Sequence, residues 1–377
     1  MPWLNNDQPF NSLKSLPPPK INLENVQILK KAIEANKYLA ELKGYCQTLP
    51  NPDLLLNTVI LQESKDSSAI ENIVTTQDDL YRALLSPFDN IQPNAKEVIR
   101  YREAMYTGLD ELKKKGVFTG KVAIRIMQRI KDSTQEYRKI GGTKLLNPNT
   151  QKIIYTPPDP IEIEKKISEW EKFVNNGNDI DPLIIMALMH YQFEAIHPFH
   201  DGNGRTGRIL NVLYLVHKGL LNQPLLYHSG YIIQNKEEYY RKLRHVTEKD
   251  QWLEWVEFML DAVKETSLTT LNTIKAIIEL KEENLGLIKG LSQKLPAYEL
   301  NELIFSFPYV KIKTLVDRKI AKRQAASTYL QKLAHQKILR TFKYGKEIYY
   351  VNHRLMDILS GRLDPSNKKL KGDMSVK

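Results

Sequence analysis

The longest dense run of hydrophobic residues lies at positions 183–195, where the sequence LIIMALMHYQFEA is almost continuously apolar. Asp181 and Pro182 precede this run. A capping residue followed by proline at a first helical position predicts that a buried helix begins there. His197-Pro198 predicts the end of that helix, because the residue before a proline is disfavoured in the helical conformation.

A second helix is predicted to begin near Gly204 and to end at Gly219, since glycine favours helix C-termini. Between these two glycines, apolar residues recur at helical spacing. They are Ile209, Leu210, Val212, Leu213 and Val216. The two predicted helices therefore enclose a short loop that begins at His197.

Most of the remaining chain is also patterned for helices. An amphipathic helix is expected at 22–48, another from 52 toward 72, and two more at 98–112 and 122–130. The apolar positions that predict the first of them are Leu23, Val26, Leu29, Ile33, Leu39 and Leu42. A later helix, capped by Asp250, is predicted by Trp252, Val256, Met259 and Val263.

One stretch is patterned for strands instead. Residues 137–146 and 152–158 predict a β-hairpin whose turn is Asn-Pro-Asn at 147–149. The predicted fold class is therefore mainly α, with one hairpin in the first two thirds of the chain.

The C-terminal part predicts a charged helical connector at 267–294, followed by several short elements. These are helices at 298–305, 311–317 and 323–335 and two strands within 338–351. Three helices and a hairpin resemble a winged helix-turn-helix module, in which residues 324–330 would belong to the third helix.

Charge sets this module apart from the rest of the chain. The 377 residues carry a formal net charge of +11. Residues 311–346 hold eleven Lys or Arg and one acid, Asp317, so their local net charge is +10 and the remainder carries +1. This basicity suits binding to duplex phosphates. A winged helix used for protein contacts or dimerisation is the alternative, and the sequence leaves both open.

Composition excludes some classes of protein. The apolar content of 42% and the charged content of 26% are ordinary for a soluble globular protein. No stretch is long and apolar enough to span a bilayer, and the N-terminus lacks the pattern of a signal peptide, so we expect a cytoplasmic protein. Cys46 is the only cysteine, which excludes an internal disulfide and a cysteine-based metal cluster.

The loop between the two central helices is rich in residues that can bind charged ligands or take part in catalysis. They are His197, His200, Asp201, Gly202, Asn203, Gly204, Arg205 and Arg208. Glycines let backbone N–H groups approach an anion, and a helix start carries the positive end of its dipole. The two arginines, three residues apart, can grip further phosphate oxygens. Asp201 offers an oxygen suited to Mg²⁺, and His197 can accept a proton near neutral pH. Together these groups predict a polyphosphate cradle for transfer of a phosphate-containing group to a hydroxyl.

Three other interpretations of the loop carry less weight. Gly202-x-Gly204-x-x-Gly207 fits the dinucleotide-binding pattern, but a helix precedes it and no acid occurs at 205–236 to hold a ribose. A metal-hydrolase pair at His200-Asp201 is disfavoured because the adjacent Pro198 and Gly202 break helices. A purely structural turn would leave this concentration of polar and glycine positions in one short loop unexplained.

The segment HPFHDGNGRTGR at 197–208 resembles the signature of the Fic family, His-x-Phe-x-Asp/Glu-Gly-Asn-Gly-Arg-x-x-Arg, at every defined position. The resemblance implies a mostly helical Fic fold and an enzyme that transfers AMP from ATP to Ser, Thr or Tyr hydroxyls of proteins. It implies that His197 is the base, that Asp201 binds Mg²⁺, that Phe199 packs the loop onto the core and that Arg208 holds the γ-phosphate. The residues implied in binding ATP and its phosphates are Gly202, Asn203, Gly204, Arg205, Thr206, Gly207 and Arg208.

Ser67-x-x-x-Glu71-Asn72, at the end of the second predicted helix, is similar to the Fic inhibitory motif Ser/Thr-x-x-x-Glu-Gly/Asn. Spacing alone would make Ser67 and Glu71 a solvated helix face. The resemblance implies instead that Glu71 reaches Arg208 and keeps the γ-phosphate out of its productive place, since a carboxylate on a guanidinium imitates phosphate oxygens. In some relatives this glutamate is thought to support removal of AMP, and the sequence leaves that second activity open.

The resemblance also implies where partners bind. The hairpin near 140–156 is placed like the Fic flap, which pairs its edge with an extended segment of a target protein, although Gly141-Gly142 departs from the usual pattern. Tyr239 and Thr247 match positions that line the adenine pocket, with ordinary core packing as the alternative. The expected partners are ATP with Mg²⁺, target proteins, a second copy of the chain in a homodimer, and DNA or protein at 311–346.

These observations divide the chain into an N-terminal helical region with the inhibitory helix (1–115), a Fic core (116–262), a helical connector (263–295) and a winged-helix-like module (296–377). We expect a protein adenylyltransferase that modifies target proteins and itself and is restrained by Glu71. The alternatives are a Fic-type transferase with another nucleotide or phosphodiester donor, and a DNA-binding regulator with a nucleotide-sensing domain.

Overall fold

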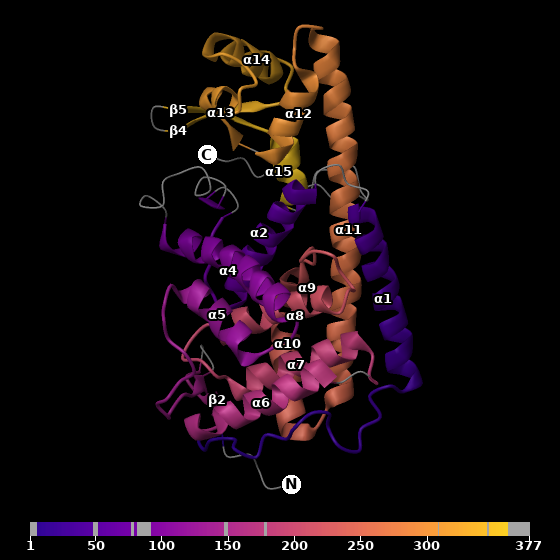
Figure 1. Cartoon of the computed structure of the whole chain (residues 1–377), viewed down its shortest axis with the longest axis vertical. Helices are drawn as coiled ribbons and strands as arrows, with labels where there is room; N and C mark the ends of the chain where they lie inside the picture. Colours follow the sequence, from indigo (N-terminus) through magenta and orange to yellow (C-terminus); the bar gives the residue numbers. More distant parts are fainter. Residues whose placement is uncertain are drawn as a thin grey trace. The chain divides into compact units, whose positions relative to one another are not determined.

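The structure, a computed structural model, describes residues 6–47, 52–76, 79–80, 92–146, 150–176, 179–307, 309–344 and 347–360. The chain is mainly helical, as predicted, and divides into two compact units (Figure 1). The first unit comprises 1–49, 59–75 and 92–268, and the second comprises 50–58, 76–91 and 269–377. No helix in the described ranges combines the length and the apolar composition needed to cross a membrane.

The first unit is built around α7 (Pro182–Ile196), whose side chains are buried all around except at its start and at Glu194. The Asp181 carboxylate caps this helix by accepting a hydrogen bond of 2.8 Å from the backbone N–H of Leu183, as the sequence predicts. Trp170 on α6 (Pro160–Asn176) donates to the Met189 carbonyl at 2.9 Å, which ties α6 to α7.

Helix α8 (Asn203–His217) lies against α7 and carries the second half of the signature. Its other side contacts α4 (Pro93–Lys115) and α5 (Gly120–Lys131). The central pair, α7 and α8, is therefore largely enclosed by helices.

Helix α1 (Val26–Gln47) packs against α7, and its predicted apolar face is correct at Leu39 and Leu42 but wrong in the first half of the helix. Val26 and Ile33 are 70% and 68% exposed. The buried face instead consists of Ile28, Ala32, Ala35, Leu39 and Leu42. In the first half of α1, the face that packs is therefore the one that carries Ile28, Ala32 and Ala35.

Helices α2 (Pro52–Ile70), α9 (His228–Gln234) and α10 (Lys236–Lys249) complete the surroundings of α8. Helix α11 then runs without interruption from Trp252 to Leu291, through the boundary expected between 262 and 263. The predicted hairpin is present as β1 (Leu145–Leu146) and β2 (Ile153–Tyr155), which pair antiparallel. Its predicted turn at 147–149 lies outside the described residues.

The second unit contains the predicted order of three helices and a hairpin. Its elements are α12 (Ala297–Ser306), β3 (Tyr309–Val310), α13 (Ile312–Asp317), α14 (Arg323–His335), β4 (Arg340–Tyr344), β5 (Glu347–Val351) and α15 (His353–Leu359). The three strands form one antiparallel sheet in the order β3-β5-β4. Strand β3 and helix α15 were not predicted from the sequence.

Candidate active site

The loop between α7 and α8 is held in one conformation by its own residues. His197 ends α7 with a φ of 48°, and Gly202 precedes α8 with a φ of 82°, where glycine carries no steric penalty. The Asn203 side chain bonds both backbone groups of Phe199, accepting from its N–H at 2.9 Å and donating to its carbonyl at 2.8 Å. The Phe199 ring is buried against Tyr137 and Phe193, so the loop is anchored in the core.

Arg138 fastens the same loop from outside the signature. Its side chain donates to the His197 carbonyl at 2.9 Å and to the Pro158 carbonyl, and its own backbone N–H donates to the Pro198 carbonyl at 2.9 Å. The guanidinium therefore joins the segment after β2 to the turn that carries His197.

The protonation of His197 follows from its surroundings. Burial, assisted by the nearby charge of Arg138, lowers the pKa of the His197 side chain to about 4. The sequence suggested an ordinary pKa near neutrality. The structure instead gives an imidazole that is unprotonated throughout the neutral range and free to accept a proton.

We expect the ring resonances of His197 to stay constant between pH 8 and pH 5 and to shift only as the pH falls toward 4. An ordinary histidine would titrate near pH 6.5. NMR of histidine-labelled protein measures this, with the His197→Ala variant used to assign the signal. A midpoint near 6.5 would contradict the burial of this ring.

The start of α8 offers unpaired donors. The first hydrogen bond of the helix runs from the Thr206 N–H to the Gly202 carbonyl at 3.0 Å, so the N–H groups of Asn203, Gly204 and Arg205 precede the helical pattern. Free N–H groups at a helix start form an anion-binding site. A side chain at Gly204 would fill it, because a Cβ there would lie 2.6 Å from Glu71 Oε1.

Arg205 and Arg208 converge on one carboxylate, that of Glu71. Glu71 Oε2 accepts from Arg205 Nε at 2.6 Å, and Glu71 Oε1 accepts from Arg208 Nη2 at 2.9 Å. Both guanidinium groups are only 1% exposed. The anion that lies against this helix start in the structure is therefore the side chain of Glu71.

Ser67 strengthens the contact between α2 and α8. Its hydroxyl accepts from Arg208 Nε at 2.8 Å, and its carbonyl accepts from Arg208 Nη2 at 2.9 Å. Asn72, which follows Glu71 with a φ of 64°, accepts a bond of 3.0 Å from Lys236 Nζ. The structure thus brings Ser67 and Glu71 to Arg208 and places Asn72 beside α10.

Asp201 lies at the solvent side of the loop, with its side chain 60% exposed. One carboxylate oxygen pairs with Lys131 Nζ at 2.7 Å, and the other accepts from the Gly202 N–H at 2.6 Å and from Arg205 Nη2 at 3.3 Å. Burial alone would raise the pKa of Asp201, but Lys131 and Arg205 bring it below its ordinary value. The carboxylate is therefore ionised at neutral pH and pairs with two cationic side chains, those of Lys131 and Arg205.

These residues fit an Mg²⁺ ion that arrives with a nucleotide. In the described part of the chain, no group of three or more His, Cys, Asp or Glu is arranged to hold a metal ion by itself. Mg²⁺ in phosphate-transfer sites is commonly bound by one or two carboxylates together with substrate phosphates. Asp201, next to the anion-binding helix start, supplies such a carboxylate.

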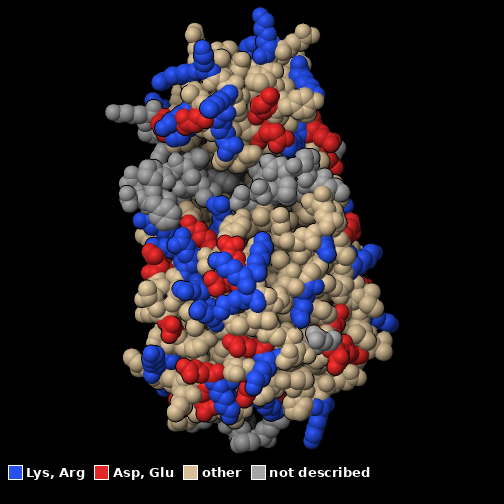
Figure 2. Space-filling model, viewed as in Figure 1, with Lys and Arg blue, Asp and Glu red and all other residues tan. Residues whose placement is uncertain are grey.

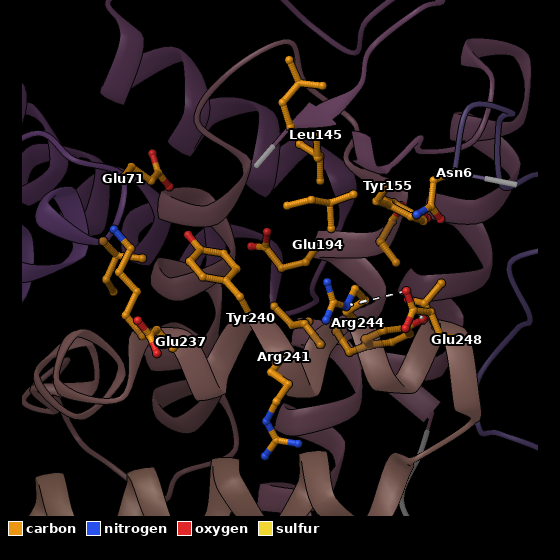
Figure 3. A pocket seen from close by; sticks show the side chains of 18 of the residues that line it. Asn6, Glu71, Leu145, Tyr155, Glu194, Glu237, Tyr240, Arg241, Arg244 and Glu248 are labelled. Atoms are coloured by element: carbon orange, nitrogen blue, oxygen red, sulfur yellow. Dashed lines mark hydrogen bonds and ion pairs between the residues drawn. The ribbon is translucent and has the colours of Figure 1, made fainter. Parts of the chain in front are cut away.

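A cavity of about 850 Å³ is lined by Glu71, which contacts both arginines, and by Glu194 and Ala195, which lie just before the loop (Figure 3). Its walls come from the end of α2, the two strands of the hairpin, α7 and α10. Glu71 lies at one side of it, while Tyr240 and Glu194 lie between Glu71 and the hairpin residue Tyr155 (Figure 3). The cavity is large enough for a nucleotide and a further group.

The structure separates the two residues that the sequence assigned to the adenine pocket. Thr247 lines the cavity and bonds the Tyr191 hydroxyl at 2.9 Å. Tyr239 is buried, and its hydroxyl bonds His190 Nε2 at 2.8 Å. Its neighbour Tyr240 lines the cavity in its place. Tyr240 and Thr247 are seven residues apart on α10 and so lie on one helix face.

Four charged residues near the loop were not found from the sequence: Glu97, Lys131, Arg138 and Glu194. Glu97 pairs with Arg205 and, at 3.3 Å, with Lys131. Glu194, one turn before His197, is the lone acid in the apolar run of α7, and burial raises its pKa to about 7. That isolated acid was the one signal in the sequence that could have identified a member of this group.

Comparisons with protein families match most of the chain to one group of proteins. The N-terminal family of Fic/DOC proteins matches residues 29–110, the Fic/DOC family matches 119–215, and the C-terminal domain of SoFic-like protein adenylyltransferases matches 280–355.

Curated relatives match over shorter stretches. A probable protein adenylyltransferase of Aquifex aeolicus is 37% identical over 94 residues, which are 25% of this chain and 27% of that protein. The protein adenylyltransferase Fic of Drosophila grimshawi is 32% identical over 114 residues, 30% of this chain and 22% of that protein. The chain thus spans about a quarter of the length of these relatives.

Solved structures are similar in fold. A Fic family protein from Desulfovibrio desulfuricans aligns with a TM-score of 0.56 at 19% identity, over 87% of this chain and 96% of its own. A Fic domain containing signaling protein from Bacteroides thetaiotaomicron aligns with a TM-score of 0.50 at 18% identity, over 63% of this chain and 96% of its own.

Proposed function

The chain belongs to the Fic/DOC family, and from that premise we propose that it is a protein adenylyltransferase, which transfers AMP from ATP to hydroxyl groups of target proteins and of itself. One observation carries the proposal. A neutral histidine, an unpaired helix start and two buried arginines meet at one loop beside a cavity of about 850 Å³.

The proposed reaction uses these groups in fixed roles. His197 takes the proton of a Ser, Thr or Tyr hydroxyl, and the oxygen attacks the α-phosphorus of ATP. The new O–P bond forms as the bond from the α-phosphorus to the bridging oxygen breaks, and pyrophosphate leaves. The N–H groups at the start of α8 and the arginines 205 and 208 hold the negative charge of the phosphates. Mg²⁺, bound by Asp201 and the phosphates, would neutralise further phosphate charge.

We propose that Glu71 restrains this reaction. Its carboxylate contacts both arginines and lies against the start of α8, the place that the reaction requires for phosphates. ATP must therefore displace Glu71 before its phosphates can bind there. The same carboxylate is near enough to the cradle to serve in removal of AMP, which we propose as a second activity.

The base of ATP is proposed to lie against Tyr240 and Thr247. In the Glu71→Gly background, Tyr240→Ala is expected to raise KM for ATP about tenfold with a smaller change in kcat, because stacking of a base on an aromatic ring contributes about 1–3 kcal/mol. Tyr239→Phe, which removes only a hydroxyl bonded to His190, is expected to change KM less. Steady-state kinetics on ATP decide between the two tyrosines, and a larger effect at Tyr239 would move the base to the buried side of α10.

Target proteins are proposed to dock at the hairpin. Ile140, just before it, is 73% exposed, and Leu146 on β1 is also exposed beside the cavity. Apolar side chains next to a two-stranded edge suit an extended segment of a partner. Such a segment would present its hydroxyl toward the His197 loop.

The main alternative is that the enzyme uses another nucleotide or a phosphodiester in place of ATP. The residues of the loop are proposed to bind the phosphates of the donor and to distinguish its base only weakly. Incubation of the full-length Glu71→Gly variant with ATP, followed by intact-mass spectrometry, tests the proposal. An added adenylyl group supports it, whereas an added phosphoryl group, or modification only with another nucleotide, rejects adenylyl transfer as the activity.

A further inference from the structure

We infer that the surface formed by α13 and α14 in the second unit binds duplex DNA, with α14 in the major groove. This inference is independent of the reaction proposed above, because it rests on elements of the second unit alone. It follows from charge, from the order of the elements and from the kind of side chains that α14 exposes.

The charge of this surface is almost entirely of one sign. Between residues 309 and 344 the chain holds ten Lys or Arg and one acid, Asp317. Lys311 is partly neutralised by an ion pair with Glu347 at 2.5 Å. The other basic residues classed as exposed are Lys313, Arg318, Lys319, Lys322, Arg323, Lys332, Lys337, Arg340 and Lys343. Figure 2 shows basic side chains projecting from the top and the left side of this unit.

The order of elements places α14 where a groove can receive it. Helix α12, strand β3, helices α13 and α14 and the β4-β5 hairpin follow one another, and the sheet order is β3-β5-β4. This is the arrangement in which the helix before the hairpin reads DNA in winged-helix proteins. At 13 residues, α14 is about 20 Å long, which suits the major groove.

Helix α14 presents one apolar face and one hydrogen-bonding face. Ala326, Leu330 and Leu333 are buried and fix the helix on its unit. The opposite face exposes Arg323, Gln324, Thr328, Gln331 and Lys332. Gln and Thr side chains can bond base edges, and Arg and Lys can bond phosphates or guanine. The mixture is what a base-reading helix requires.

The same face argues against a protein partner at α14. Among the described residues of α14, no large hydrophobic side chain is strongly exposed. Of the exposed large hydrophobic residues in the described part of the second unit, Val316 lies on α13, and Leu287, Tyr298 and Ile348 lie outside the surface of α13 and α14. Protein interfaces concentrate aromatic and aliphatic anchors at their centre and are depleted in Lys. The α14 surface has the reverse composition, so DNA is the partner that its chemistry favours.

Fluorescence anisotropy of the full-length protein with a labelled duplex of about 25 base pairs of random sequence tests this inference. We expect binding at low salt, with an affinity that falls as salt rises because counterions are released from the phosphates. The double variant Lys319→Ala, Arg323→Ala is expected to weaken binding and to lower the salt slope by about 2, roughly 1 for each cationic side chain removed from a phosphate.

The matched control is Lys113→Ala, Lys114→Ala, which removes two exposed lysines from α4 of the first unit. Its affinity and salt slope should equal those of the unaltered protein, and circular dichroism checks that both variants fold. If both double variants weaken duplex binding equally, the affinity depends on net charge alone and the inference is wrong. Absence of duplex binding at low salt would overturn it as well.

A separate experiment tests whether α14 recognises a particular base sequence. A preferred sequence is first selected from a random duplex pool with the full-length protein. Gln324→Ala, Thr328→Ala should then remove most of the preference for that duplex over a random one while keeping the salt slope. If no sequence is enriched and a protein is captured through the same face, the partner of α14 is a protein and the inference is wrong.

Discussion

Replacing His197 with alanine is expected to lower the rate of adenylyl transfer by about 10²- to 10⁴-fold, the contribution of general-base catalysis, while ATP still binds. The reason lies in the separation of roles within the loop. The phosphates are proposed to contact the start of α8 and the arginines 205 and 208, none of which His197 holds in place through its side chain. Transfer of label from ATP in the Glu71→Gly background, with calorimetry of ATP binding, measures both quantities.

His200→Ala is the matched control for that experiment. His200 belongs to the same loop but is exposed and lies three residues from the proposed base. Its replacement should leave the transfer rate within about twofold. A His197→Ala variant that folds, binds ATP and transfers AMP at the unaltered rate would remove His197 from the reaction.

Replacing Glu71 with glycine is expected to raise ATP-dependent self-modification about tenfold or more. Each charge-assisted hydrogen bond that a ligand must displace costs about 1.5–3 kcal/mol, and Glu71 makes one to each of Arg205 and Arg208. Removing even one of these competing bonds favours the phosphates by about tenfold. Glu71 follows the last residue of α2, so glycine at this position does not interrupt the helix.

The control for Glu71 is Glu238→Ala, which removes an exposed carboxylate from α10 that does not line the cavity. Rates of self-modification and the KM for ATP should be unchanged in this variant. If Glu71→Gly and Glu238→Ala behave alike, the contact between Glu71 and the arginines is a structural one and does not restrain the enzyme.

Much of the first unit could be predicted because its strongest signals are local. The apolar run at 183–195, the cap at Asp181 and the stop at His197-Pro198 all act within a few residues, and α7 begins and ends within one residue of these signals. Most elements of the second unit were predicted for the same reason, from periodicity and turn residues, whereas β3 and α15 were not predicted.

Contacts between distant residues could not be predicted in this way. The resemblance implied that Glu71 meets Arg208, but the bonds of Arg205 to Glu71 and to Glu97 join residues more than 100 positions apart. No periodic pattern encodes such pairs. The pKa of His197 was missed for the same reason, because burial and Arg138 set it.

One helix was predicted as two. A helix capped by Asp250 and a separate helical connector at 267–294 were expected, yet α11 runs without a break from Trp252 to Leu291. The Thr266 hydroxyl bonds the Ala262 carbonyl at 2.6 Å and the Thr273 hydroxyl bonds the Thr269 carbonyl at 2.9 Å, so these residues satisfy their polar groups within the helix.

The central claim is that the loop between α7 and α8 moves AMP from ATP to a hydroxyl with His197 as the base. Intact-mass spectrometry of two full-length proteins incubated with ATP tests it most directly: one carries Glu71→Gly, the other carries Glu71→Gly together with His197→Ala. The account predicts an added adenylyl group on the first protein and none on the second. Adenylyl groups on both, or on neither while both bind ATP, would contradict it.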